Sequence, residues 1–377
     1  MISHPFFYLL FISVMAALAL VLSKKEYKAL KYIPPIVLLY MSVMVLSSWG
    51  IVEKNDEITQ SYATFKSNLL PAMLFLMLLP NKITVLSRLG GKMILTFFLA
   101  SGSLFFAFVL SFMLFSQQTE DIEILGPLAG SWMGGTGNML AVASAIDASE
   151  NAVGITMLID SVDYSLWVMF LLLLVPLASS FNRFTKSSDP IEDVAFEERC
   201  ALHFSYRGYI WLLLSALLIS LLSQLGGIFL SKLFGSATTW SVIFATLFGI
   251  AFSFSSLAKT KGLQSTANTM LYLLIALIAS RADIRFDLSL LSYLFMGLSI
   301  LSIHAVLMLI FAKLFRLDLF TVSVASLANV GGIASAPILS AAYAQSLVGI
   351  GVLMATLGYI IGTFGALFLT QLLRWIS

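Results

Sequence analysis

The chain has 377 residues, of which 59% are hydrophobic and 11% charged, and its formal net charge is +2. Soluble globular domains carry about 25% charged residues, so this composition excludes an ordinary soluble protein and indicates an integral membrane protein. The small net charge is spread over short loops, which argues against a nucleic-acid partner. The single cysteine, Cys200, excludes an internal disulfide and a cysteine metal cluster.

Twelve apolar segments follow one another along the chain, and most approach the ~20 residues that a helix needs to cross a bilayer. They do not alternate apolar and polar residues, which favours helices over the strands of a membrane β-barrel. We therefore predict an all-α polytopic membrane protein. In chain order the segments are 6–22, 32–50, 67–80, 93–116, 128–149, 153–178, 209–234, 237–257, 265–280, 288–315, 319–344 and 347–373.

A polar stretch at residues 179–208 divides these segments into two groups of six. It mixes both charge signs and contains Asp189-Pro190, which is typical of a solvent-exposed linker. We therefore predict a first repeat over residues 1–178, a cytoplasmic linker over 179–208 and a second repeat over 209–377.

Two interrupted segments, residues 128–149 and 319–344, give the main sign of a repeat. A shift of 197 positions places Gly134 on Gly331 and Gly135 on Gly332. Glycine-broken backbone is tolerated at membrane depth only where it is buried in protein or lines a cavity. Matched interrupted segments in the two halves are the sequence sign of a secondary transporter.

The distribution of Lys and Arg favours one of two topologies. If all twelve segments cross and the N-terminus lies outside, the cytoplasmic loops hold 10 of the 21 basic residues, which is no bias. If each interrupted segment enters and leaves on the same side, 15 lie inside, as the positive-inside rule expects. We therefore predict two inverted repeats, ten crossing helices, one broken, re-entrant hairpin per repeat and both termini outside. A broken segment that crosses fully is the alternative, because the linker alone supplies four of the inside charges.

The motif GSWMGGTGNM at residues 130–139, together with ANVGGIASAP at residues 328–337, resembles the bacterial membrane family catalogued as domain of unknown function 819. The resemblance covers the whole chain and implies a place in the cation/proton antiporter and anion transporter superfamily. It further implies an elevator-type core domain with crossed broken helices, a panel domain and a location in the bacterial cytoplasmic (inner) membrane. It implies no substrate. Ile333 stands where the family pattern has proline, which leaves the geometry of the second break open.

The residues around the two breaks form the predicted substrate site. Glycine pairs allow positive φ and a close approach of ligand to backbone. Half-helix N-termini attract anions, whereas exposed C-terminal carbonyls suit Na⁺. Helix packing through small residues is the alternative, although asparagine side chains are not needed for it. The predicted substrate-binding residues are Gly134, Gly135, Thr136, Asn138, Asn329, Gly331, Gly332 and Ser335.

Asp160 and Asp163 are predicted to hold the coupling cation, Na⁺ or H⁺. They lie three residues apart on one segment and therefore share a helix face. An ionised carboxylate at membrane depth is costly and normally marks an ion pathway, and two close carboxylates can share a proton or bind Na⁺. The alternative is that both lie in the headgroup region. Ser131 and Ser326 are added as neutral oxygen ligands.

Two further features are assigned structural roles. His304 lies in the middle of its segment and is interpreted as a histidine packed against a neighbour rather than a titrating group. Residues 281–287 alternate in charge sign, which predicts a solvated surface network of little energetic weight.

We expect a secondary active transporter that moves a small organic solute, with an anion favoured, by Na⁺ or H⁺ coupling. A cation/proton antiporter that uses Asp160 and Asp163 is the alternative, and a channel or an intramembrane enzyme is less favoured. The sequence lacks a Gly-Lys-Ser/Thr phosphate loop, a His-Glu-x-x-His helix and a Gly-x-Ser-x-Gly elbow. We therefore predict no enzyme activity and no cofactor besides the coupling cation. The predicted partners are the solute and the lipid bilayer, with a homodimer left open.

Overall fold

The computed structural model describes most of the chain, and the structural statements below concern that part. Every element named there is a helix, and the β contact recorded in it is an isolated bridge between Ile2 and Val52. The all-α fold class is therefore confirmed. The described residues are 1–23, 35–53, 55–80, 89–115, 118–187, 206–234, 237–282, 289–344 and 347–377.

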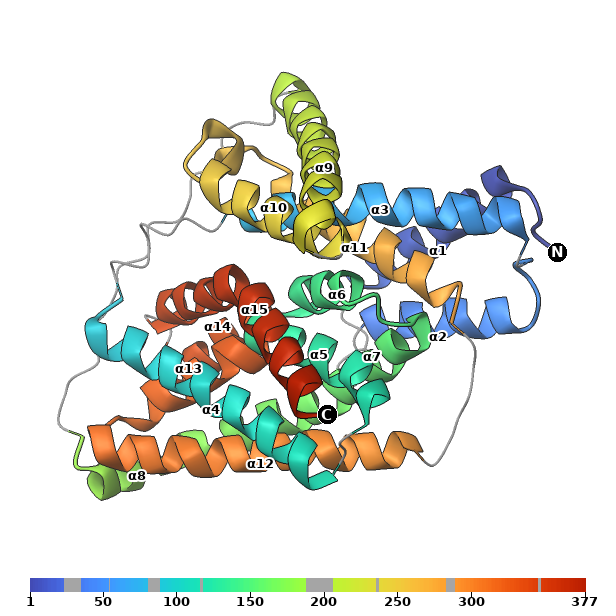
Figure 1. Cartoon of the computed structure of the whole chain (residues 1–377). Helices are drawn as coiled ribbons and strands as arrows, with labels where there is room; N and C mark the ends of the chain where they lie inside the picture. The colour runs from blue at the N-terminus through green and yellow to red at the C-terminus, as the bar shows by residue number, and fades with distance from the viewer. Residues whose placement is uncertain are drawn as a thin grey trace. The chain divides into compact units, whose positions relative to one another are not determined.

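Figure 1 shows the helices in chain order. Those before residue 188 are α1 (Pro5–Ser23), α2 (Pro35–Ser48), α3 (Asp56–Leu78), α4 (Gly91–Phe115), α5 (Thr119–Gly134), α6 (Thr136–Ala145), α7 (Glu150–Leu174), the 3₁₀ helix η3 (Val175–Leu177) and α8 (Ala178–Thr185). Those after residue 205 are α9 (Tyr206–Phe234), α10 (Ala237–Phe252), the 3₁₀ helix η4 (Ser256–Lys259), α11 (Leu263–Ala279), α12 (Ser289–Phe315), α13 (Leu319–Val330), α14 (Gly332–Tyr343) and α15 (Val348–Ile376).

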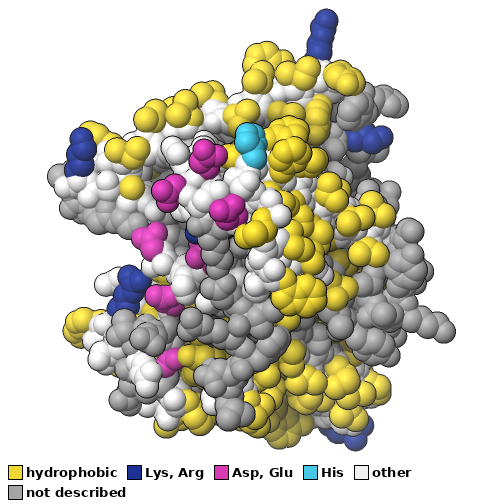
Figure 2. Space-filling view, turned by 90° about the vertical axis from the view of Figure 1, so that its right-hand side faces the viewer, with side chains coloured by type: hydrophobic (Ala, Val, Ile, Leu, Met, Phe, Trp, Pro, Cys, Tyr) yellow, Lys and Arg dark blue, Asp and Glu magenta, His cyan; other side chains and the backbone are white. Residues whose placement is uncertain are grey.

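The described surface carries large apolar side chains. Phe229, Leu314 and Phe368 expose 67%, 69% and 67% of their area, and Figure 2 shows hydrophobic side chains over much of the face in view. Exposure of such an apolar surface to water is unfavourable, whereas contact with the hydrocarbon layer of a membrane is not. The helices long and apolar enough to cross a membrane lie at residues 5–23, 91–115, 150–185, 206–232, 290–315 and 348–376. Multiple crossings of a membrane are therefore supported by both length and surface chemistry.

The chain divides into two compact units, and each unit draws on both halves of the sequence. Unit 1 comprises Met1–Pro80, Ala143–Ser161 and Cys200–Asp287, so it holds α1 to α3 and α9 to α11. Unit 2 comprises Asn81–Val142, Val162–Arg199 and Leu288–Ser377, and it holds α4, α5 and α12 to α15. Helix α7 begins in unit 1 and ends in unit 2.

Helices α3 and α5 begin far earlier than the apolar pattern predicts. Helix α3 begins at Asp56 rather than Ser67, because Asn55 caps it by accepting a 2.9 Å bond from the backbone N–H of Ile58. Asp56 and Glu57 lie in its first turn, where carboxylates complement the positive helix end. Helix α5 likewise begins at Thr119 rather than at Leu128, so Asp121 and Glu123 lie inside it.

The predicted linker begins with a helix rather than a loop. Helix α8 covers Ala178–Thr185, and the Asn182 side chain accepts a 2.9 Å hydrogen bond from the backbone N–H of Leu319. Lys313 donates a hydrogen bond to the Phe184 carbonyl. These bonds fix the start of the linker against the region before α13 in unit 2. Residues 188–205, the rest of the linker, lie outside the described part.

The first broken segment folds back on itself. Helix α5 ends at Gly134, and Gly135 takes φ 93° and ψ 177°, a region that is essentially restricted to glycine. A Cβ atom on Gly130 would lie 2.9 Å from the Asn138 carbonyl oxygen and 3.0 Å from the Val142 side chain. In a continuous helix Gly130 and Val142 would be about 18 Å apart. Helices α5 and α6 therefore form a hairpin.

The second broken segment is also a hairpin. Helix α13 ends at Val330 and α14 begins at Gly332, which has a φ of 59°. The rings of Phe320 and Tyr343 lie 5.3 Å apart between centroids, although a continuous helix would separate these residues by about 35 Å. The Tyr343 hydroxyl also reaches Ser323 at 3.5 Å. Both interrupted segments thus have a turn where the glycine pairs predict one.

Helix α15 passes directly against the first hairpin because glycines line its contact face. A Cβ atom on Gly362 would lie 2.7 Å from the Met133 carbonyl oxygen and 2.8 Å from the Gly134 Cα. One on Gly358 would lie 3.0 Å from the same carbonyl and 3.1 Å from that of Ala328 in α13. Small residues spaced by four permit such backbone approach between membrane helices.

We predict that Gly362→Ala destabilises the protein, because the added methyl meets backbone atoms that cannot rotate away. Overpacking of this kind typically costs about 1–3 kcal/mol. Gly102→Ala in α4 is the matched control, since nothing lies within 4 Å of its Cβ position and alanine in a helix is favoured by about 0.5–1 kcal/mol. Melting temperatures in detergent should fall for the first variant and hold or rise for the second; equal temperatures would contradict this packing.

Candidate functional site

The two glycine breaks meet inside unit 2. A Cβ atom on Gly332 would lie 3.9 Å from the Gly135 Cα. The Tyr359 ring of α15 lies beside both, at 3.3 Å from the Cβ position of Gly135 and 3.4 Å from that of Gly332. The sequence predicted a common site between the breaks, and the geometry brings these residues together. We call this place the break site, defined by Gly134, Gly135, Gly331, Gly332 and Tyr359.

Helix ends of both polarities gather at the break site. Helices α6 and α14 begin there, at Thr136 and Gly332, and α5 and α13 end there, at Gly134 and Val330. The first-turn N–H groups carry partial positive charge and suit an anion, while the last-turn carbonyls suit a cation. This arrangement can therefore bind an anionic group and a small cation close to one another.

Asn138 belongs to the packing of the break site against α15. Its amide donates to the carbonyl oxygens of Gly358 and Tyr359 at 3.4 and 3.3 Å, and its side chain is 2% exposed. Gly134 has no room for a side chain because a Cβ atom there would lie 1.8 Å from the same amide. The asparagine thus fixes the first hairpin on α15 by hydrogen bonds.

Ser335 brings an unused hydroxyl to the second break. Its side chain is 3% exposed, and its oxygen has no hydrogen-bond partner within the described residues. The Cβ position of Gly331 is 2.1 Å from that oxygen, so the hydroxyl lies against the break. An unsatisfied buried hydroxyl costs about 1–3 kcal/mol, which a ligand that bonds to it would offset.

Asn329 is hydrogen-bonded between helices α4 and α13. Its carbonyl oxygen accepts a 2.7 Å bond from the Ser101 hydroxyl of α4, and its amide donates to the Ala325 carbonyl at 2.9 Å. The residue is fully buried. The asparagine thus holds α13 against α4, and its role in substrate binding stays a prediction.

Ser326, predicted as a ligand of the coupling ion, lies instead in a buried chain of hydrogen bonds. Its oxygen is 3.0 Å from the Trp167 indole nitrogen and 2.8 Å from the His304 Nε2. The His304 Nδ1 lies 2.6 Å from the Ser103 oxygen. The chain joins α7, α13, α12 and α4, so four helices of unit 2 share one polar connection.

The donors in this chain can be assigned. The Ser103 hydroxyl is placed to donate to the Ala100 carbonyl at 2.8 Å, so its oxygen accepts from a protonated His304 Nδ1. The Nε2 atom then accepts from the Ser326 hydroxyl, whose oxygen accepts from the Trp167 N–H. Every hydrogen is used once, and His304 is neutral in this arrangement. The interpretation of His304 as a packed structural residue is thus extended by two specific partners.

Helix α7 brings an aromatic residue to the second break. The Tyr164 ring would lie 2.5 Å from a Cβ atom on Gly331. Asp163 precedes it directly in the chain and is fully buried. Asp160 is half-buried and belongs to the part of α7 assigned to unit 1.

The remaining predicted residues lie near the first break. Thr136 is half-buried and is the first residue of α6. Ser131 is 2% exposed, and its carbonyl accepts the 2.6 Å bond from the N–H of Gly135 that closes α5. Groups of three or more His, Cys, Asp or Glu side chains suited to a metal do not occur in the described ranges.

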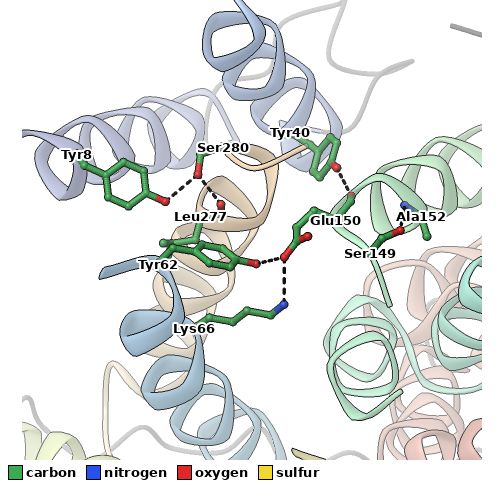
Figure 3. A network of polar contacts seen from close by, with 9 residues as sticks. All are labelled: Tyr8, Tyr40, Tyr62, Lys66, Ser149, Glu150, Ala152, Leu277 and Ser280. Carbon is green, nitrogen blue, oxygen red and sulfur yellow. Dashed lines mark hydrogen bonds and ion pairs between the residues drawn. The ribbon is translucent and has the colours of Figure 1, made fainter. Parts of the chain in front are cut away.

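Unit 1 holds a second polar cluster, which the sequence analysis missed (Figure 3). Glu150, the first residue of α7, accepts a 2.5 Å hydrogen bond from Tyr62 and lies 3.5 Å from the Lys66 ammonium. Its backbone carbonyl accepts a 2.7 Å bond from Tyr40. The sequence does contain a sign of this helix start, because a serine followed by an acidic residue is typical of a helix N-terminus. In the structure Ser149 is the N-cap and accepts a bond from the N–H of Ala152.

Arg281 adds a second cation to this cluster. Its guanidinium lies 5.8 Å from the centre of the Tyr62 ring, and one of its nitrogens is buried. Nearby, Tyr8 and Ser280 share a 2.7 Å hydrogen bond. The predicted solvated network is therefore wrong for Arg281, which packs on an aromatic ring. Residues 283–287 of that network lie outside the described part.

Comparison with known proteins places these features in a family without an assigned activity. Residues 10–376 match the family described as "Protein of unknown function (DUF819)". The "Uncharacterized membrane protein YjcL" of Bacillus subtilis (strain 168) is 23% identical over 390 residues, which cover 95% of this chain and 94% of that protein. The resemblance drawn from the two glycine motifs is confirmed at the level of the family. Both breaks and α7 lie within the matched region.

We predict that Ser326→Ala destabilises the protein by about 1–3 kcal/mol, because the buried Trp167 N–H and the His304 Nε2 each lose a partner. Ser302→Ala on α12 is the control, since its exposed hydroxyl only bonds to the Leu298 carbonyl of its own helix. Melting temperature in detergent would measure the difference. Identical melting of the two variants would show that these buried hydrogen bonds contribute little to the stability of the protein.

Proposed function

This chain belongs to the DUF819 family of membrane proteins, and on that premise we propose that it is a secondary active transporter. It takes up a small organic anion, coupled to Na⁺ or H⁺, by alternating access. The observation that carries the proposal is the break site, where two hairpins meet with two helix N-termini directed at one place. Broken helices that cross in this way bind substrate and ions in transporters.

An anionic solute suits the break site better than a neutral one. The first turns of α6 and α14 lie at this site and carry partial positive charge on their N–H groups, and the Ser335 hydroxyl is an additional donor with no other bond in the described part. A carboxylate could accept from all three. Tyr359 and Tyr164 would supply apolar contact to the remainder of the solute.

Contacts within unit 1 support the ten-crossing topology. That topology places the start of α3, the start of α7 and the end of α11 on the outer side. The all-crossing alternative places α3 on one side and the other two on the opposite side. In the structure Glu150 contacts Lys66, and Arg281 lies over Tyr62. The ten-crossing topology agrees with these contacts, because it places the contacting helix ends on the same side of the membrane.

Contacts within unit 2 support the same topology independently. Lys92, Lys186 and Arg316 line one pocket, which we call the basic pocket. The ten-crossing topology places all three on the cytoplasmic side, whereas the all-crossing alternative places Lys92 opposite the other two. We therefore propose inverted repeats with re-entrant hairpins, an N-terminus and a C-terminus outside and a cytoplasmic linker.

The composition of the two units supports an elevator mechanism. Unit 2 contains α13, α14 and most of the first hairpin, with α15 between the breaks. Unit 1 contains the first three helices of each half. A unit that carries the whole break site can move as a body and expose that site to each side in turn.

Asp163 is the favoured coupling residue. It is buried in α7 directly before Tyr164, which contacts the second break. A buried carboxylate favours either a bound proton or a nearby cation, and carbonyls at the ends of α5 and α13 would complete a Na⁺ site. Asp160, Ser131 and Ser326 are proposed as secondary contributors, and the Ser326 hydroxyl also bonds to the His304 ring.

A cation/proton antiporter is the second candidate, because a buried acid at a pair of broken helices also suits exchange of Na⁺ for H⁺. Everted membrane vesicles with a pH-sensitive dye separate the two. Collapse of a preformed proton gradient by Na⁺ or K⁺ alone would support the antiporter and contradict coupled uptake of a solute. A channel would give flux that no ion gradient can concentrate.

We predict that Ser335→Ala leaves the free protein as stable or more stable, because it removes an unsatisfied buried hydroxyl, yet weakens solute binding about 2–13-fold. The assay is a thermal-shift screen of dicarboxylates, amino acids and dipeptides with and without Na⁺. Ser340→Ala on the same helix is the control, since its hydroxyl bonds to the Ala336 carbonyl at 2.9 Å. An unchanged thermal response in Ser335→Ala would remove this hydroxyl from the site.

We predict opposite accessibility for single cysteines at Asp147 and Lys186. In a Cys200→Ser background, a membrane-impermeant maleimide should label Asp147→Cys from outside intact cells and Lys186→Cys only after lysis. Both positions are exposed. Glu57→Cys, at the exposed start of α3, is outside in either topology and serves as the control. The reversed pattern would establish fully crossing broken segments.

A further inference from the structure

We propose that the basic pocket of unit 2 binds the phosphate headgroup of an anionic phospholipid. The pocket has a volume of about 390 Å³ and is lined by Gly91, Lys92, Leu95, Lys186, Phe315, Arg316 and Leu317. Three cations thus come from the beginning of α4, the end of α8 and the end of α12. Among these lining residues none is acidic.

The backbone adds to the positive field of the pocket. Gly91 is the first residue of α4, a helix of 25 residues, whose free N–H groups carry partial positive charge. Lys186 ends α8, and Arg316 directly follows α12. Asp318, the nearest acid along the chain, is 4% exposed and accepts two bonds from Thr321 at 2.8 and 2.7 Å. Its carboxylate is occupied in capping α13.

Exposed apolar side chains continue from the pocket along two helices. Leu95 on α4 and Phe315 on α12 line the pocket and expose 43% and 42% of their area. Leu314 beside Phe315 exposes 69%. Inorganic phosphate has no apolar part that could contact these side chains, whereas the acyl chains of a lipid would contact them. The combination of cations at a helix start and apolar neighbours therefore favours a lipid over a free anion.

The backbone of the two loop cations allows clean test variants. Lys186 and Arg316 have φ values of 58° and 53°, in the left-handed region that asparagine tolerates better than most residues. Lys186→Asn with Arg316→Asn therefore removes two charges without opposing the local backbone. Lys259→Asn with Lys261→Asn is the control, because both lysines are exposed and lie in unit 1.

The experiment uses the full chain purified in a neutral detergent and titrated with phosphatidylglycerol, phosphatidylcholine or inorganic phosphate. Thermal shift and native mass spectrometry report binding. Phosphatidylglycerol should raise the melting temperature and remain bound, whereas phosphatidylcholine should not. The double variant at Lys186 and Arg316 should bind phosphatidylglycerol about 25-fold more weakly, since each cation near a lipid surface contributes roughly a factor of five.

Three outcomes would overturn the proposal. Equal shifts with phosphatidylcholine would show binding without selection of charge. A shift with inorganic phosphate as large as that with phosphatidylglycerol would assign the pocket to a soluble anion. Equal weakening of phosphatidylglycerol binding in the Lys259 and Lys261 control would show that the effect comes from the change in total charge and not from the pocket. Transport is not part of this readout, so the result stands apart from the proposed function, and a melting curve without lipid checks that each variant is folded.

Discussion

Close approach of backbone to backbone at the two glycine breaks is the constraint on which the rest of unit 2 depends. Gly134, Gly358 and Gly362 leave no room for a side chain between the first hairpin and α15. Because the backbones touch, the two hairpin turns lie next to each other, and four helix ends of both polarities come together there. The partial charges of these helix ends follow from the backbone packing, and in the proposed site they stand beside the carboxylate of Asp163.

Much of this architecture was readable from the sequence. Long apolar segments predicted helices, and Gly134-Gly135 and Gly331-Gly332 predicted two breaks, because paired glycines in an apolar run mark a change of chain direction. The helix beginnings were predicted less well. Asn55 and Ser149 extend α3 and α7 through polar sequence by capping them, and hydropathy alone does not detect a cap.

The partners of individual side chains could not be predicted. Asn329 and Ser326 stood beside a break in the sequence, yet the first bonds to Ser101 and the second to His304 and Trp167. Periodicity indicates which face of a helix is buried, whereas the residue opposite that face depends on the packing of helices distant in sequence. The same limit hid the contact of Glu150 with Lys66, since 84 positions separate them in the chain.

The two glycines of the first pair are required for different physical reasons, so they differ in how a substitution could be tolerated. Gly134 is needed for space, whereas Gly135 is needed for its torsion angles of 93° and 177°, which side-chain-bearing L-residues essentially do not adopt. A neighbour's mutation to a smaller residue could open space for alanine at position 134. No such partner change relieves the strain that a side chain would cause at position 135, because that strain arises in the residue's own backbone.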